Sequence, residues 1–335
     1  MAGYALRRLA LAVPILIGVS LIVFLMLHSA GGDPAQVKLG ARADPESVAA
    51  LRHEMGLDRP LATQYLEFLA DAARGDLGRS YRSDSLVSSE VFSRFPATIE
   101  LTVVALAIGA VVGLTAGTIA ATRRGSILDY LSTLGALIGV SVPTFWLGML
   151  LIIVVGAKLE WLPISGRVNP RLGADPSAHF LILSSAVHGN WTIFWDALRH
   201  ILLPALTLAG WPASIIARMT RASLIESLGE DYVRTARAKG LEERDVVRRH
   251  AFRNALIPVV TVVGLELGGL LGGAVVTETV FAWPGVGKLT ADAIAARDYQ
   301  VTQGVVLLLG AVFVLINLLV DLVYAVIDPR IRHRS

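Results

Sequence analysis

Two acidic residues in or beside an apolar stretch are the side chains of this chain best placed for unusual chemistry. Glu266 lies within the apolar stretch Ala255–Thr277, and Glu278 follows its end. An acid at the centre of a bilayer costs about 2.5–3.5 kcal/mol on insertion scales, so it needs a partner or a water-filled cavity. Together with Ser141 and Pro143, which interrupt another apolar stretch, these acids are our candidates for the lining of a polar path across a membrane.

Other chemical signatures in the sequence are incomplete. Residues 285–289, Gly-Val-Gly-Lys-Leu, resemble part of a phosphate-binding loop. That loop requires an earlier glycine and a Ser or Thr after the lysine, and Ala282 and Leu289 occupy these positions. The 7 histidines are scattered without metal-ligand spacing, and Ser141 has no histidine or lysine partner within a span. We therefore expect no catalytic residue, no metal site and no nucleotide site in this chain.

The densest charge in the chain runs from Glu230 to Asn254, between two apolar stretches. Charge on this scale does not lie in hydrocarbon, so we expect a water-facing loop. Two short helices are predicted in this loop, one ending before Gly240 and one running from Glu242 to Arg253. Each has acidic residues at its amino end and basic residues at its carboxyl end, in agreement with the helix dipole. Such a loop fits either a docking element for a partner protein or a juxtamembrane segment that touches anionic lipid.

Composition places these features in an integral membrane protein. The chain has 335 residues, of which 54% are hydrophobic and 17% charged, and its net charge is only +3. The absence of cysteine excludes disulfides and thiol catalysis. We expect an all-α protein with six transmembrane helices, at residues 9–27, 101–121, 131–157, 201–217, 255–277 and 301–327.

Basic residues and the first apolar segment predict the topology. Residues 1–29 lack a good cleavage site, so we expect an uncleaved signal-anchor helix. Basic residues favour the cytoplasmic side of a membrane. Arg123, Arg124 and the basic tail at 330–334 therefore predict that the amino and carboxyl termini are both cytoplasmic.

The chain divides into three predicted parts, of which the signal-anchor helix is the first. Residues 30–97 form an extracytoplasmic subdomain, and residues 98–335 form the membrane core with a cytoplasmic loop at 222–254. Two amphipathic helices are expected in the subdomain, one after Asp44 and one after Pro60. The subdomain fits either a packing lid or a binding surface.

Small residues and proline shape the predicted spans. Gly109, Gly113 and Gly117 recur every four residues and would let another helix approach closely, either within this chain or from a partner. Pro143 would kink the third span. The apolar run at 178–187 is too short to cross a bilayer, so we expect a re-entrant or interfacial segment there.

The charged loop closely resembles the cytoplasmic coupling motif of ABC importer permeases. Residues 231–241 read Asp-Tyr-Val-Arg-Thr-Ala-Arg-Ala-Lys-Gly-Leu, and residues 253–258 read Arg-Asn-Ala-Leu-Ile-Pro. Both match the dipeptide, oligopeptide and nickel branch, first (B-type) permease subunit. Further matching stretches lie at 75–80, 94–98, 143–146, 162–166, 202–205, 281–287 and 328–330. The wider family motif begins Glu-Ala-Ala, whereas this chain has Arg-Thr-Ala at 234–236, so a role for that glutamate does not carry over.

This resemblance implies a type I ABC importer permease fold and a set of partners. A second, homologous permease would form a heterodimer with this chain in a bacterial-type cytoplasmic membrane, surrounded by lipid and without nucleic acid. One or two cytoplasmic ATPases would bind ATP and Mg, and an extracytoplasmic binding protein would deliver the cargo. The permease would hold no cofactor and would not be an enzyme. By the same resemblance, the ATPase contact consists of Asp231, Tyr232, Arg234, Thr235, Ala236, Arg237, Ala238, Lys239 and Gly240.

The function that the resemblance implies is ATP-driven transport of di- or oligopeptides by alternating access. Nickel chelates, glutathione, haem or another small solute are alternative cargoes for the same machinery. An ion-coupled secondary transporter is the alternative from a different class. It would require internal repeats with paired ionisable residues near the midplane, whereas only Glu266 is plainly within the middle of a span.

Overall fold

All named elements of the chain are helices. The computed structural model describes residues 2–29, 33–40, 42–175 and 178–327. Within these ranges the only strand-like pairing is an isolated bridge between Arg79 and Leu86. The predicted all-α class is confirmed for this part of the chain, and the basic tail at 330–334 lies outside it.

The membrane-spanning helices occur where the apolar stretches predict them. Among the described residues, four helices are long and apolar enough to cross a membrane: α5 (Val87–Thr122), α9 (Trp191–Gly229), the continuous helix Glu243–Val280 that includes α12 (Phe252–Val280), and α14 (Tyr299–Ile327). A fifth span results if α6 (Ile127–Ser141) and the helix after it are counted together. Helix α1 (Ala2–Ser29) coincides with the first predicted span, and its described apolar part is Val13–Ser29.

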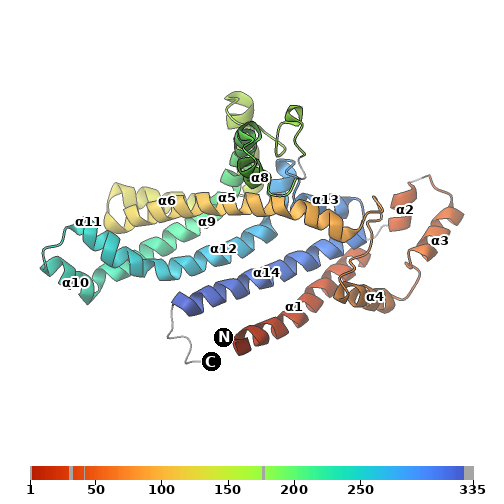
Figure 1. Ribbon diagram of the computed structural model, residues 1–335, viewed down its shortest axis with the longest axis horizontal. Coiled ribbons are helices and arrows are strands. Elements are labelled where there is room, and N and C mark those ends of the chain that lie inside the picture. Colours follow the sequence, from red (N-terminus) through yellow and green to blue (C-terminus); the bar gives the residue numbers. More distant parts are fainter. Residues whose placement is uncertain (1, 30–32, 41, 176–177, 328–335) are drawn as a thin grey trace.

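Figure 1 shows the long helices lying side by side in an elongated bundle. Helices α5, α9 and α14 run in one direction, and α1 and α12 run back. The short helix α10 (Asp231–Ala238) lies at one end of the bundle, together with the loop that follows α5. Helices α2 (Pro34–Leu39), α3 (Pro45–Glu54) and α4 (Leu61–Ala73) lie at the opposite end.

The most extensive contact in the bundle is between α5 and α9. The glycine stripe on α5 makes it possible. A Cβ added at Gly113 would lie 2.7 Å from the carbonyl oxygen of Ala213, and one at Gly117 would lie 2.5 Å from that of Ala217. Of the two predicted uses of the stripe, the structure therefore shows close packing within this chain.

Two helices extend beyond the predicted spans that they contain, and one predicted helix end is wrong. Helix α5 begins at Val87, inside the range 30–97 assigned to the subdomain, and α9 begins at Trp191 rather than at residue 201. Packing stabilises the early start of α5, because Val87 and Val91 are fully buried in an apolar cluster with Val286 and Val305. The second helix of the charged loop does not end at Arg253, because α11 (Glu243–Asp245), η3 (Val246–Ala251) and α12 form one continuous helix.

The third predicted span is broken rather than kinked. Helix α6 and the segment formed by α7 (Thr144–Leu151) and the π-helix η1 (Ile152–Lys158) meet at an angle of 103°. Val142 is extended, with ψ of 123°, and it precedes a proline, which disfavours the helical conformation. The shorter helices η2 (Pro170–Leu172), α8 (Leu181–Val187) and α13 (Val286–Ala295) complete the connections between the long helices.

The helices of the segment 30–97 start where the sequence predicts. The Asp44 carboxylate caps α3 by accepting the Ser47 amide at 2.9 Å, and Pro60 precedes α4. Helix α4 packs on α1, where the Tyr65 hydroxyl donates to the Ile17 carbonyl oxygen at 2.9 Å. The end of the subdomain is attached to the start of α14, because the Ser80 hydroxyl bonds the buried Asp298 at 2.6 Å.

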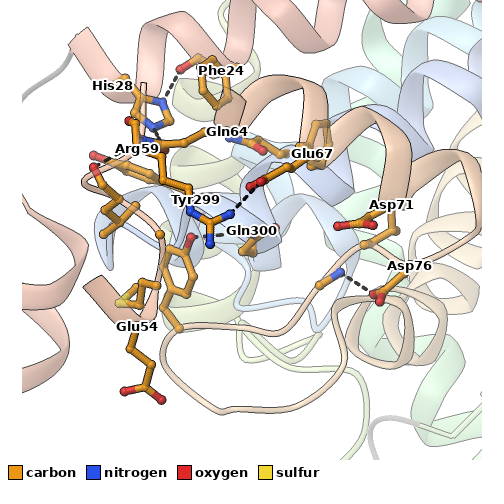
Figure 2. Close-up of a pocket in the computed structure, with 18 residues that line it drawn as sticks. Phe24, His28, Glu54, Arg59, Gln64, Glu67, Asp71, Asp76, Tyr299 and Gln300 are labelled. Carbon is orange, nitrogen blue, oxygen red and sulfur yellow. Dashed lines mark hydrogen bonds and ion pairs between the residues drawn. The ribbon is translucent and has the colours of Figure 1, made fainter. Parts of the chain in front are cut away.

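Figure 2 shows a pocket between α4, the end of α1 and the start of α14. Its lining is polar and includes four acidic residues, Glu54, Glu67, Asp71 and Asp76. Glu67 forms an ion pair with Arg59 at 2.6 Å, and Asp76 accepts the Gly78 amide at 2.8 Å. Both of these contacts lie within the subdomain. The hydrogen bonds of Tyr65 to α1 and of Ser80 to Asp298 join the subdomain to the membrane core.

Candidate functional site

Helix α10 is built by local signals in the charged loop. Asp231 lies in its first turn and Arg237 in its last, which matches the helix dipole. Gly240 follows with φ of +78°, a conformation that favours glycine. Its amide donates to the Arg237 carbonyl oxygen at 2.9 Å. This turn sends the chain from α10 directly into the long helix that contains α12.

One face of α10 is buried against the ends of two spanning helices. Val233 is 0% exposed and Ala236 is 5% exposed. Both belong to an apolar cluster that includes Leu224 of α9 and Val246 and Ala251 of η3. The end of α9 and the start of the helix that contains α12 both contribute residues to this cluster. A displacement of α10 would therefore be transmitted to both spans.

The opposite face of α10 is open to solvent. Exposed on it are Asp231, Tyr232, Arg234, Thr235, Arg237, Ala238, Lys239 and Gly240. All the predicted contact residues except Ala236 are therefore available to a partner. Ala236 contributes to the attachment of the helix to its own chain.

Ion pairs orient the basic residues of this face. The Arg237 guanidinium bonds both oxygens of Glu243, at 3.0 and 2.7 Å, across the Gly240 turn. Hydrogen bonding to Glu243 raises the pKa of Arg237, so this cation stays charged at any physiological pH. Arg234 lies 3.1 Å from Asp231. Exposed pairs of this kind add little stability, and their effect is to hold the side chains in place.

The proposed path residues lie at separate positions in the bundle. Ser141 and Pro143 are exposed at the corner between α6 and α7, on an open apolar face that includes Trp146. Glu266 is half-buried on α12, and Trp211 of α9 lies close enough to its carboxyl to interact with it. An acid within a span requires such a polar neighbour or a wet surrounding.

Glu278 is fully buried and supports the start of α13. Its Oε1 accepts the Thr98 hydroxyl at 2.7 Å, and its Oε2 accepts the Lys288 amide at 2.9 Å. Thr98 Oγ1 in turn accepts the Val286 amide at 2.9 Å. A Cβ at Gly285 would lie 2.3 Å from a carboxylate oxygen. The partial phosphate-loop sequence thus binds an acidic group of its own chain, because the Lys288 amide donates to the Glu278 carboxyl, and Glu278 supports the start of α13.

A buried ion pair that the sequence did not predict holds the connection between η1 and α9. Arg167, 1% exposed, bonds Glu100 of α5 at 2.6 Å. The second oxygen of Glu100 accepts the Ile182 amide at 2.9 Å, and Arg167 lies over the Trp283 ring at 6.0 Å. Glu100 adjoins an apolar stretch, which is a signal, whereas Arg167 lies in a mixed segment, and their pairing across the sequence is not a local pattern.

Two family models match the chain. The binding-protein-dependent transport system inner membrane component matches residues 113–333, and the N-terminal component of the same systems matches residues 1–102. The chain belongs to this family. It is a permease subunit of an ABC importer and a multi-pass protein of an inner membrane, as the coupling motif predicted.

Relatives of this permease match it from end to end. The dipeptide transport system permease protein DppB of Escherichia coli (strain K12) is 46% identical over 339 residues, covering 100% of both chains. The di/tripeptide transport system permease protein DppB of Pseudomonas aeruginosa (strain UCBPP-PA14) is 45% identical over 335 residues, with 100% of both covered. The glutathione transport system permease protein GsiC of Escherichia coli O6:H1 is 42% identical over 334 residues, again with 100% of both covered.

A solved structure shares the fold of the permease. A chain of the MetNI methionine ABC transporter, in inward-facing conformations, matches with a TM-score of 0.52 and 21% identity. The match covers 69% of this chain and 93% of that chain. This likeness concerns the fold, which is that of an ABC transporter permease.

Proposed function

We propose that this permease carries short peptides inward across a bacterial-type cytoplasmic membrane by ATP-driven alternating access. The relatives support this cargo, because their names specify dipeptides, di/tripeptides and glutathione, which is itself a tripeptide. The identity extends over the full length of each chain, so it includes every segment that could line a path.

The two-sided structure of α10 is the observation that carries the proposal. Its exposed face offers a small surface to a cytoplasmic ATPase, while Val233 and Ala236 attach its other face to α9 and η3. Closure of the ATPases on ATP and Mg would push α10, and α9 and α12 would move with it. One or two ATPases, a second homologous permease and an extracytoplasmic binding protein complete the proposed importer. Catalysis of ATP hydrolysis is assigned to the ATPases, not to this chain.

The proposed orientation places α10 and both termini in the cytoplasm. The path is proposed to pass the α6–α7 corner, with Ser141 and Pro143, and the half-buried Glu266. Glu278 contributes to the path by positioning α13, since its carboxylate is enclosed in hydrogen bonds.

Cross-linking at single cysteines tests the docking surface, because the chain has no cysteine of its own. In the complete importer, Thr235→Cys on the exposed face of α10 should cross-link to an ATPase through a thiol-to-amine reagent. Ser83→Cys, exposed at the opposite end of the bundle, is the control and should not. An equal yield of ATPase adduct from both positions would refute the assignment.

Uptake into proteoliposomes tests the mechanism. The reconstituted importer should accumulate a labelled dipeptide when ATP is supplied on the α10 side, and an imposed proton or sodium gradient without ATP should not replace it. Gradient-driven uptake by this chain alone would instead support the ion-coupled transporter.

A further inference from the structure

A groove of about 700 Å³ lies between the last turns of α5 and the helix formed by α11 and η3. It adjoins the charged loop at residues 230–254, hereafter called the coupling loop. Its apolar wall includes Leu114, Ile119, Val247 and Phe252. Thr115 and Thr122 of the same wall donate their hydroxyl hydrogen bonds to carbonyl oxygens of their own helix, at 2.7 and 2.8 Å. They therefore present mainly methyl groups, and the wall is suited to an apolar ligand.

The rim of this groove is basic. Arg123 at the end of α5 and Arg244 and Arg248 on the facing helix line it, and all three are exposed. No described residue forms an ion pair with any of them. The one acid on the rim, Glu243, is bonded at both oxygens by Arg237, so its charge is already compensated.

We infer that this groove binds an anionic glycerophospholipid. Its phosphate would lie against Arg244 and Arg248, with Arg123 across the groove, and one acyl chain would follow α5 toward the middle of the membrane. The wall from Thr122 to Leu114 extends for about 12 Å at the helical rise of 1.5 Å per residue, enough for a substantial part of an acyl chain. Guanidinium groups match phosphate oxygens in geometry as well as charge.

Charge complementarity favours lipid over the other occupants of such a groove. Inorganic phosphate would satisfy the arginines and leave the apolar wall exposed. A helix from another protein would cover the wall but would have to bring acidic side chains to the rim. An anionic lipid supplies both parts in one molecule, and basic clusters at the cytoplasmic ends of spans are suited to such headgroups.

The position of the groove gives the bound lipid a structural consequence. One wall belongs to α5, and the other belongs to the segment that follows α10 through the Gly240 turn. A lipid in the groove would brace the coupling loop against the α5–α9 pair. This inference concerns a lipid site and holds whatever cargo the importer carries.

Lipid retention tests the inference with a matched pair of double variants. The full-length protein is reconstituted in vesicles of equimolar phosphatidylglycerol and phosphatidylcholine and re-extracted, and the co-purifying phospholipids are counted by mass spectrometry. Arg244→Gln with Arg248→Gln removes two charges from the rim. Arg249→Gln with Arg253→Gln removes two charges from the same segment outside the groove lining. The first pair should lose phosphatidylglycerol preference by about 30-fold, equivalent to about 2 kcal/mol, and the second pair should keep it.

A third variant separates the lipid from its alternatives. Thr115→Trp fills the apolar wall and leaves every arginine in place, so it should also abolish retained phosphatidylglycerol. Retention that survives this change would show that only the phosphate is bound. Equal losses in both double variants would show a diffuse charge effect without a site. Unchanged lipid in all variants, with a co-purifying membrane subunit lost in Thr115→Trp, would show that a protein helix occupies the groove; each of these results overturns the inference.

Discussion

The same substitution at positions 236 and 238 of α10 should have different consequences, one for the folding of the helix and the other for its binding to the ATPase. Ala236 is 5% exposed and faces the apolar cluster, whereas Ala238 lies on the solvent-exposed face of α10. Ala236→Asp should detach α10 from its own chain. Ala238→Asp should leave α10 folded and weaken its contact with the ATPase.

The magnitude of each effect follows from burial. Both variants add one negative charge, and each loses about 0.7 kcal/mol of helix propensity. At position 236 the carboxylate would in addition lie unpaired in the cluster with Leu224 and Val246, which costs about 3–5 kcal/mol. The variant can avoid part of this cost if α10 unfolds locally and exposes the new carboxylate to water. We therefore expect local unfolding of α10 in Ala236→Asp. At position 238 the charge stays in water, and the expected loss is about tenfold or more in ATPase affinity, or about 1.4 kcal/mol.

Two measurements on each variant separate the outcomes. Hydrogen exchange of the amides in residues 231–241 reports whether α10 is folded, and titration with the partner ATPase reports docking. We expect fast exchange only in Ala236→Asp, and weakened binding with normal exchange in Ala238→Asp. Fast exchange in Ala238→Asp, or protected amides in Ala236→Asp, would show that the burial assignment of the two faces is wrong.

Three further substitutions test the packing around the site. Gly117→Leu should destabilise the protein by about 1–3 kcal/mol through overpacking against α9, which is measured as a lower melting temperature in detergent. Gly135→Leu is the control and should leave the melting temperature unchanged, because a Cβ at Gly135 meets nothing within 4 Å. Arg167→Met should cost about 3–5 kcal/mol by leaving Glu100 buried and unpaired, and adding Glu100→Gln should recover much of the loss; no recovery would argue against the pair. Glu278→Ala should lower the melting temperature by leaving buried donors unsatisfied at about 1–3 kcal/mol each, and normal stability would contradict its role at α13.

The apolar stretches and the local helix signals determined much of the fold. The distribution of apolar residues along the chain predicted where the long helices lie, because a bilayer-spanning segment must satisfy its own backbone and cover itself with apolar side chains. Asp44, Pro60 and Gly240 predicted helix ends, since capping and left-handed turns depend only on neighbouring residues. The coupling motif predicted the family, because it is a contiguous pattern of residue types.

The tertiary structure alone decided which side chains face one another. Helical spacing placed Ala236 and Ala238 on the same small helix, but the cluster formed by α9 and η3 decides which of them is buried. Glu278 lies beside an apolar stretch, and it is enclosed only when Thr98 of α5 and the start of α13 pack against it. The partner of Arg167 is Glu100, from a helix earlier in the chain. Burial and pairing depend on residues brought together by folding, and no local pattern of sequence records them.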